Sequence, residues 1–367
     1  MRISEIAGVM DEAAPPRLAA SWDRIGLQVG RADADARRVL VGLGPSDELL
    51  REAAERGVQL LVCHHPLIFH PLQGLTDSTP AERMAAELVR AAIAFFAAHT
   101  NLDAAPGGTN DALAEVMGLA DVRPLAPAEL KLAKVAVFVP SSHVEAVSAA
   151  ICNAGAGQIG AYRDCTFRLE GTGTFTPGEG SRPFIGKQGA LERVQETRLE
   201  SIVPREGVAA VIDAMRRAHP YEEPAFDVYP LENTLRTGGL GRCGMLPRPM
   251  PLAEFAGEAA RRLHSPATRF AGDARRIVAK AAVSAGAGID LADAARAEGC
   301  DVLLTADVKY HQFLDARDRG LAVIDAGHAE TELPGVRALW SMLRARLPGV
   351  EVLLSEAPAA VVQRAPA

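Results

Sequence analysis

The sequence predicts an α/β fold in which two related βαβαβ halves form one discontinuous outer domain that carries an inserted α+β domain. Strand-like and helix-like segments alternate twice, once before residue 126 and again after residue 236. The segment between them instead combines period-two strands with two amphipathic helices. We therefore expect an outer domain of residues 1–125 and 237–367 and an inserted domain of residues 126–236.

The chain is predicted to begin with an amphipathic helix over residues 3–20 that ends around Pro15 and Pro16. An irregular connection follows, and Trp22 and Asp23 are its unusual residues. A packed indole and a turn-forming carboxylate are the simplest interpretation of this pair. We therefore assign the pair no functional role at this point.

Each predicted half contains three strands with helices between them. In the first half, the helix at 46–57 has Ser46 as its N-cap and ends at Gly57. A closing helix and a last strand at 333–358 complete the outer domain. The strands are expected at 37–44, 58–66 and 91–103 in the first half and at 276–288, 300–311 and 321–332 in the second, with further helices near 80–91 and at 289–299 and 312–320.

The inserted segment reads as strand, helix and strand, and then repeats that order. A strand at 132–140 precedes a helix at 141–155 with Ser142 as its N-cap, and an alternating strand at 163–177 follows. Residues 195–231 again read as strand, helix and strand. This order predicts a small α+β domain, whose expected role is assembly or gating of a site in the outer domain.

Polar residues cluster where four of the predicted outer-domain strands end. The four segments are HHP at 64–66, HTNLD at 99–103, DVKYH at 307–311 and GHAETE at 327–332. Strands that alternate with helices imply a parallel sheet, and such sheets bind ligands beyond the carboxyl ends of their strands. We therefore expect one site, shared between the two halves, where these segments meet.

The composition argues against several classes of protein. A net charge of -7 with both signs interspersed provides no basic field for nucleic acid. The longest apolar run, at 91–98, is far shorter than the roughly 20 residues that span a bilayer, and residues 1–12 show no secretory signal. Five scattered cysteines without a CxxC pair fit a reducing compartment. A folded cytoplasmic protein is expected.

The residue types at the strand ends favour a transition-metal site. Imidazoles and carboxylates together suit zinc, iron, manganese or cobalt, whereas magnesium and calcium prefer oxygen. His64 and His65 are adjacent and would point to opposite sides of a continuing strand, a conflict that the end of the strand or a pair of ions resolves. His328 and Glu332 are four residues apart and would share one face of a helix that begins there. Asp103 lies in a loop beside glycines.

Other histidines and one glycine motif have simpler interpretations. His99 is more often a hydrogen-bonded structural histidine than a ligand, and Cys63 is expected in the core. The GxGxxG match at 239–244 has no apolar strand before it and three prolines after it, so it does not predict a dinucleotide site. Neither a P-loop nor a GxSxG motif occurs in the sequence. Surface positions are expected for His70, His143 and His264.

Long motifs at these positions resemble the Nif-three-like dinuclear metal-centre proteins, often labelled type 2 GTP cyclohydrolase I homologues. The resemblance covers nearly the whole chain and is to the longer subgroup, whose insert is similar to the trimer-forming, ferredoxin-like domains of the PII and CutA kind. The matching motifs are SWDRIGLQVG, VCHHPLIF, HTNLDAAPGGTND, LLTADVKYHQFLDA and DAGHAETE in the outer domain, and IGAYRDCTFRLEGTGTF, FIGKQGALERV and HPYEEPAFDVYPLEN in the insert.

This resemblance implies two divalent metal ions per chain, with one or both carboxylates bridging them. It also implies a homo-hexameric ring whose sites face an inner cavity, with Asp307 and His311 lining the same cleft. Two positions depart from the family: Gly44 stands where an aspartate is usual, and residues 284–288 lack the usual serine-bearing glycine loop. Both departures are expected to alter substrate contacts. The implied metal ligands are His64, His65, Asp103, His328 and Glu332.

Hydrolysis of a nucleotide by metal-activated water is the leading functional hypothesis. Paired divalent ions activate water and clamp an oxyanion or a phosphate, and His311 or His99 would then move protons. The family label implies GTP as the substrate, with attack at C8 of the guanine and release of formate. The alternative is a non-enzymatic metal carrier or regulatory metal-binding protein, because the same ligands would serve it equally well.

Overall fold

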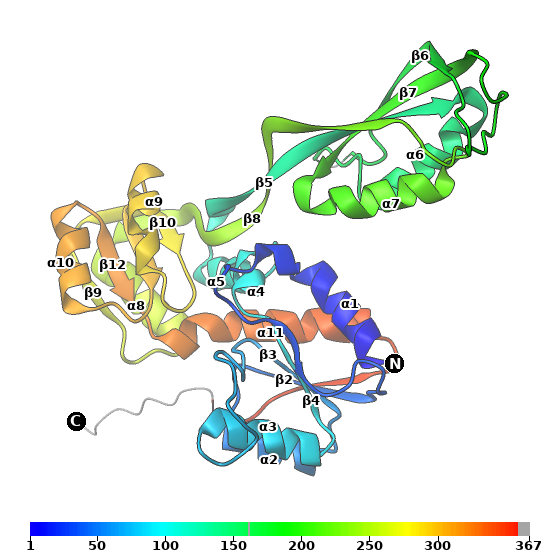
Figure 1. The fold of residues 1–367 in the computed structure, drawn as a ribbon. Helices are drawn as coiled ribbons and strands as arrows, with labels where there is room; N and C mark the ends of the chain where they lie inside the picture. The colour runs from blue at the N-terminus through cyan, green and yellow to red at the C-terminus, as the bar shows by residue number, and fades with distance from the viewer. Residues whose placement is uncertain (161, 359–367) are drawn as a thin grey trace. The chain divides into compact units, whose positions relative to one another are not determined.

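The structure, a computed structural model, describes residues 1–160 and 162–358 and divides into two compact units. The outer unit comprises Met1–Ala128 and the chain from Thr237 onward, and the inserted unit comprises Glu129–Arg236. The insert thus begins slightly later than residue 126, where the sequence pattern put it. The predicted mixed α/β class is confirmed, with two β-sheets (Figure 1).

The first sheet lies in the outer unit and has the strand order β1-β4-β3-β2-β13. Strands β2, β3, β4 and β13 run parallel, and β1 forms an antiparallel edge against β4. Strand β3 is buried at all four of its residues, which explains its continuous apolar sequence. The strands span Gly26–Val29 (β1), Arg38–Gly42 (β2), Leu60–Cys63 (β3), Ala94–Ala97 (β4) and Glu351–Leu354 (β13).

Successive side chains of a strand point to opposite faces, so these apolar strands present apolar side chains on both faces of the first sheet. Helices cover each face. Val39 and Val62 pack with helices α1 and α11, whereas Leu40 and Leu61 pack with α2 and α3. Helix α1 ends at Ala13, well before residue 20, since prolines follow it and a 3-10 turn at Pro16–Leu18 replaces the helix. The helices span Ile3–Ala13 (α1), Asp47–Glu55 (α2), Pro80–Arg90 (α3) and His328–Arg346 (α11).

The second half of the outer unit repeats this arrangement. Strands β10, β11 and β12 are consecutive parallel neighbours, and β9 forms an antiparallel edge against β12, as β1 does against β4. Helices α9 and α10 cover one face, and α5 and α8 cover the other. The elements span Thr109–Met117 (α5), Leu252–Arg262 (α8), Arg269–Ala271 (β9), Ile277–Val283 (β10), Ala292–Ala297 (α9), Val302–Thr305 (β11), Tyr310–Asp318 (α10) and Ala322–Asp325 (β12).

The two halves exchange their last helices. Helix α5 follows β4 of the first sheet, yet its Leu113 packs in the core of the second sheet. Helix α11 follows β12 of the second sheet, yet its Leu339 packs in the core of the first. The two helices cross closely at Gly335, where an added Cβ would lie 2.6 Å from Cγ2 of Thr109. This exchange brings the strand ends of both sheets to a common region.

The inserted unit carries the strands β6-β7-β5-β8 of the second, eight-stranded sheet, in which β5 and β6 both pair antiparallel with β7. With the two described helices α6 and α7, this is the ferredoxin-like order of a doubled βαβ unit. The helix at 141–155 is shorter than predicted. A 3-10 turn at Ser141–His143 precedes it, and Ser142 does not cap it. The elements span Ala120–Pro140 (β5), Val144–Asn153 (α6), Thr166–Phe175 (β6), Glu192–Pro204 (β7), Val208–Ala218 (α7) and Phe226–Pro251 (β8).

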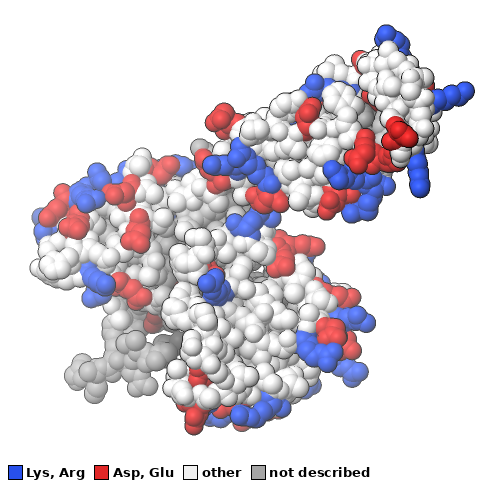
Figure 2. Space-filling model, viewed as in Figure 1, with Lys and Arg blue, Asp and Glu red and all other residues white. Residues whose placement is uncertain are grey.

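The described surface is mixed in charge. On the face shown in Figure 2, lysines and arginines are interspersed with acidic residues, and no continuous basic patch is visible there. Within the described residues, no helix combines the length and the apolar character needed to span a bilayer. All five cysteines are unpaired, and Cys63 is buried as expected.

Candidate metal centre

His64 and His65 follow β3 directly, where the strand gives way to an irregular turn. The backbone N–H of His64 donates to Gly42 O at 3.3 Å and that of His65 to Leu43 O at 2.8 Å, so the end of the neighbouring strand β2 holds both residues. His64 is buried, and its Nδ1 lies 2.9 Å from Ala98 O. Because a carbonyl only accepts, Nδ1 carries the proton, and Nε2 of neutral His64 keeps its lone pair for another partner.

Glu332 is the centre of the cluster. It lies one helical turn after His328, at the start of α11, and it is buried. Its Oε1 lies 3.1 Å from Nε2 of His328 and 3.5 Å from Nε2 of His64, and its Oε2 lies 2.8 Å from Nε2 of His65. The expected helical pairing of His328 with Glu332 is therefore present. One carboxylate faces three imidazoles from both halves.

Asp103 completes this constellation from the short helix α4 (Thr100–Ala104). Its Oδ1 lies 3.6 Å from Nε2 of His64, and both atoms are buried without a hydrogen-bond partner among the described residues. Two buried lone-pair atoms that face each other are unfavourable unless a proton or a metal ion lies between them, and at 3.6 Å this pair is wider than a hydrogen bond. This pair of orphaned atoms fits a metal ion of the kind that binds imidazole and carboxylate.

The electrostatics of the cluster also favour a cation. Burial alone would raise the pKa of Glu332, but hydrogen bonds with His328 and His65, together with the charge of His64, hold it far below its usual range. Burial lowers the pKa of His64, yet the charges of Asp103 and Glu332 outweigh it and raise that pKa to about 9. Burial raises the pKa of Asp103. Without a metal the site holds protons that a divalent ion would displace.

His99 belongs to the cluster, although the sequence favoured a structural role for it. His64, His65 and His99 offer nitrogen atoms within 4.8 Å of one another, and a second such group comprises His65, His328 and Glu332. His65 is common to both groups. Imidazole ring centroids of His64 and His99 are 5.2 Å apart. Each of the two overlapping groups could hold a metal ion.

The sequence interpretation of Trp22 and Asp23 was wrong. Trp22 is mostly exposed and its ring contacts His99, whereas the Asp23 side chain is fully buried. Oδ1 of Asp23 lies 2.9 Å from Nδ1 of His99, and Thr100 donates to Oδ2 through both its backbone N–H and its hydroxyl. Burial would raise the pKa of Asp23, but these hydrogen bonds lower it strongly. Asp23 therefore orients His99.

Asp307 has the matching position in the second half. Its Oδ2 lies 2.7 Å from Nδ1 of His328, and hydrogen bonds with Glu332 and Asp307 raise the pKa of His328 to about 9. Asp307 adopts a left-handed backbone with φ of 55°. His311 is exposed on α10, and among the described residues its ring contact is with Tyr310. The structure therefore brings Asp307, but not His311, into contact with the cluster.

The loop at 284–288, which departs from the family motif, shapes the site by packing against Glu332, a contact that the sequence did not reveal. At Gly286, with φ of +61°, an added Cβ would lie 2.5 Å from Oε1 of Glu332. Its N–H donates to Thr331 Oγ1 at 3.0 Å, and its carbonyl accepts from Thr305 Oγ1 at 2.9 Å. Only a residue without a side chain fits between this loop and Glu332.

Comparison with known proteins supports the fold and the resemblance. Residues 1–359 match the sequence profile of the family described as Duf34/NIF3 (NGG1p interacting factor 3). A Bacillus subtilis protein named "GTP cyclohydrolase 1 type 2 homolog" is 42% identical over 356 residues, which cover 96% of this chain and 95% of that protein. A similarly named Mycobacterium tuberculosis protein is 39% identical, covering 91% of this chain and 89% of its own length.

Among solved structures, a Bacillus cereus protein related to NIF3 matches with a TM-score of 0.87 and 39% identity. That match covers 100% of this chain and 99% of the other.

Proposed function

This chain belongs to the Duf34/NIF3 family, and on that premise we propose that it is a metal-dependent hydrolase that holds two divalent ions and acts on a nucleotide. The observation that carries the proposal is the position of Glu332, whose two oxygens face the Nε2 atoms of three histidines. The orphaned atoms of His64 and Asp103 support the same reading. The ligands would be His64, His65, Asp103, His328 and Glu332.

Divalent ions bound there would supply Lewis acidity, which activates water and neutralises charge on a phosphate or carbonyl oxygen. The chain itself contributes orientation and proton transfer. Asp23 accepts the Nδ1–H of His99, so the Nε2 lone pair of neutral His99 is left either to add to the binding of an ion beside His64 and His65 or to take a proton from a reacting group. The name of the curated relatives supports GTP as the first substrate to test, with C8 of its guanine lost as formate.

Metal analysis of purified protein tests the ligand set. We expect about two ions per chain in the wild type and one or none in His65→Ala and Glu332→Ala. His70→Ala is the matched control, because His70 is an exposed histidine that contacts Phe69 instead of the cluster. Unchanged metal content in both ligand variants would overturn the ligand assignment.

Incubation of the metal-loaded protein with GTP and a panel of nucleotides tests the reaction. Formate release that disappears in Glu332→Ala but survives in His70→Ala supports hydrolysis. A metal carrier is the second candidate, since part of the cluster is open to solvent: the His65 side chain is 32% exposed. A carrier would leave every nucleotide intact and release its metal to a competing apo-protein.

We also propose that the chain forms a homo-hexameric ring in the cytoplasm, as the family resemblance implies. The ferredoxin-like order of the inserted strands supports this, because such domains are able to associate through their sheets. Native mass spectrometry of the full chain should give six subunits. A monomer or dimer at micromolar concentration would contradict the ring.

A further inference from the structure

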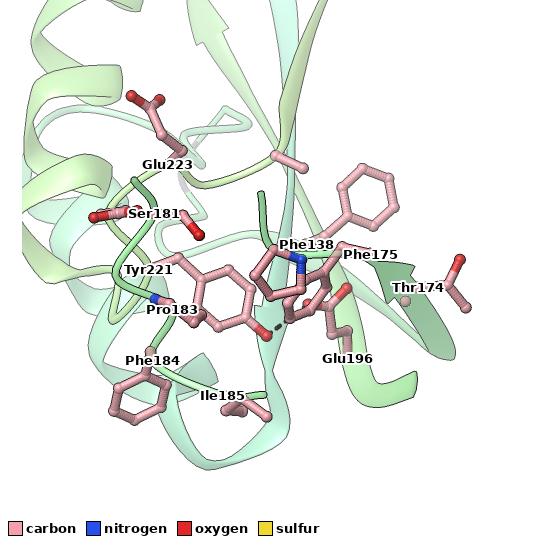
Figure 3. A pocket seen from close by; sticks show the side chains of 14 residues that line it. Phe138, Thr174, Phe175, Ser181, Pro183, Phe184, Ile185, Glu196, Tyr221 and Glu223 are labelled. Carbon is pink, nitrogen blue, oxygen red and sulfur yellow. Dashed lines mark hydrogen bonds between the residues drawn. The ribbon is translucent and has the colours of Figure 1, made fainter. Parts of the chain in front are cut away.

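The inserted unit contains a cavity of about 400 Å³ that lies within that unit alone (Figure 3). Its walls come from β5, β6 and β7 and from the segments at 177–185 and 221–225. This volume falls in the range of small-molecule sites, which are concave, mostly apolar and equipped with a few placed polar groups. Nothing in the proposed hydrolase reaction uses this cavity.

Aromatic side chains form much of the wall. The ring centroid of Tyr221 lies 5.9 Å from that of Phe175 and 6.3 Å from that of Phe184, with the planes tilted by 63° and 49°. Figure 3 shows Tyr221 with its hydroxyl directed to Glu196. Tilted rings present both faces and edges to the cavity, and ring faces attract cations.

Glu196 supplies a buried carboxylate to the same cavity. The residue is 8% exposed, and its Oε1 accepts a hydrogen bond of 2.9 Å from the Tyr221 hydroxyl. Its Oε2 has no hydrogen bond within the part of the chain that the structure describes. On the neighbouring strand, a Cβ at Gly173 would lie 2.0 Å from that Oε2, so glycine keeps the space that the carboxylate occupies. The carboxylate is thus placed by its surroundings, with one oxygen left for a ligand.

His219 fixes the segment that carries Tyr221. The backbone N–H of Tyr221 donates to Nδ1 of His219 at 3.1 Å, so Nε2 carries the proton and donates to Phe138 O at 3.0 Å. On the other side, Glu222 accepts from the backbone N–H of Arg182 at 2.8 Å. Both segments that line the cavity are therefore held in place before any ligand arrives, which reduces the entropic cost of binding.

The charge of the lining is one-sided. Of the described residues that line the cavity, three are acidic and none is basic. One guanidinium close to the lining, that of Arg198, lies over the Phe138 ring and is paired with Glu200 at 2.8 Å. A buried carboxylate beside aromatic rings, without a basic partner in the lining, selects positive charge.

We propose that this cavity binds a small organic ammonium ion, with the charged nitrogen at Glu196 and the apolar part against Tyr221, Phe175 and Phe184. The ligand class follows from the lining: an anion would meet three carboxylates, and a neutral donor would leave the negative charge of the Glu196 carboxylate uncompensated. All residues that line this site lie in the inserted unit, so its test does not depend on the proposed hydrolase reaction.

Titration of the full-length protein with 2-phenylethylammonium tests this, using saturation-transfer NMR and calorimetry. Its neutral analogue 2-phenylethanol has nearly the same shape and lacks only the charge. We expect the ammonium ion to bind at least about tenfold more tightly than the alcohol, a difference of the size expected for a charge-assisted hydrogen bond. Equal affinities, or no ammonium binding at about 10 mM, would overturn the proposal.

Two variants locate the binding. Glu196→Gln preserves the shape and should remove the preference for the ammonium ion, whereas Glu170→Gln should retain it. Glu170 is the matched control because it is exposed on the adjacent strand β6, opposite Thr197 and therefore on the other face of the sheet from Glu196. Gly173→Ala, whose Cβ displaces the carboxylate, should also weaken binding. Retained preference in Glu196→Gln with an unchanged melting temperature would contradict the site.

Discussion

Asp23 holds His99 through a contact of 2.9 Å between its Oδ1 and the ring Nδ1. The same relationship recurs in the other half, where Oδ2 of Asp307 lies 2.7 Å from Nδ1 of His328. In both pairs the carboxylate fixes the ring and leaves Nε2 directed elsewhere. Carboxylates that hold the far nitrogen of an imidazole orient metal-binding histidines and raise their basicity. Each half therefore contributes a carboxylate that orients a histidine, in addition to metal ligands.

Asp23→Asn should weaken metal binding about 10- to 100-fold, because His99 loses its anionic partner and its fixed orientation. The buried amide would also meet the donors of Thr100 in place of an acceptor, which should lower the free energy of unfolding by about 1–3 kcal/mol. Competition with a fluorescent zinc chelator and urea unfolding measure the two effects. Asp33→Asn, an exposed aspartate paired with Arg31, is the control. Equal zinc affinity in both variants would refute an orienting role for Asp23.

Asp307→Asn should have a smaller effect than Asp23→Asn, because the Asp307 side chain is 58% exposed and an ion pair open to water contributes little. Asparagine tolerates the left-handed backbone at this position, whereas alanine does so less readily. Asp307→Ala should therefore cost stability as well as metal affinity. The ranking of chelator affinities, wild type above Asp307→Asn above Asp23→Asn, is the measurement. A reversed order would show that burial does not decide the strength of these contacts.

Local sequence patterns were enough to locate the strand ends, and hence His64, His65 and Glu332, because each apolar strand is short and stops at polar residues. The contact of Asp23 with His99 was not predictable, since His99 is 76 residues away and a lone Asp after Trp is typical of a turn. The exchange of α5 and α11 between sheets was equally hidden. Both helices are apolar on one face, and periodicity does not say which sheet a face will cover.

Gly286→Ala should disrupt the metal centre without any change to a ligand. An alanine Cβ would lie 2.5 Å from Oε1 of Glu332, and the φ of +61° adds backbone strain. Glu332 must then move away from His64 and His328, so bound metal should fall to about one ion per chain or fewer. Elemental analysis measures this. Gly299→Ala also changes a glycine with positive φ, but it meets no atom within 4 Å, so it should keep its metal.

Gly44→Asp should strengthen metal binding by up to about tenfold, since a new carboxylate there would hold His65. A Cβ at Gly44 would lie 3.1 Å from the Cβ of His65 and 3.3 Å from its Nδ1, which is tight but close to a hydrogen-bonding position. Among the described residues, no hydrogen bond reaches that Nδ1. Gly44→Ala introduces the same Cβ without the carboxylate and isolates the steric effect. If aspartate binds metal no better than alanine, His65 does not need this partner.

Acid should loosen the segment that carries Tyr221, because His219 must be neutral to hold it. Burial lowers the pKa of His219 from its usual range, although Glu196 nearby acts in the opposite direction and His143 acts with burial. The unfolded state therefore binds a proton more readily. The contribution of His219 to stability is complete above about pH 6.5 and is lost as pH falls through its lowered pKa, by at most about 1.4 kcal/mol per pH unit.

Hydrogen exchange at the Tyr221 amide, corrected for its intrinsic pH dependence, reports this directly, since that N–H donates to Nδ1 of neutral His219. Protonation places a hydrogen on Nδ1 and removes the acceptor, so protection in the wild type should fall as the pH drops through the lowered pKa of His219, below about 6.5. In His219→Gln protection should be lower throughout and should no longer depend on pH, whereas His70→Gln should behave as the wild type. Protection that does not change with pH in the wild type would mean that His219 does not control the segment.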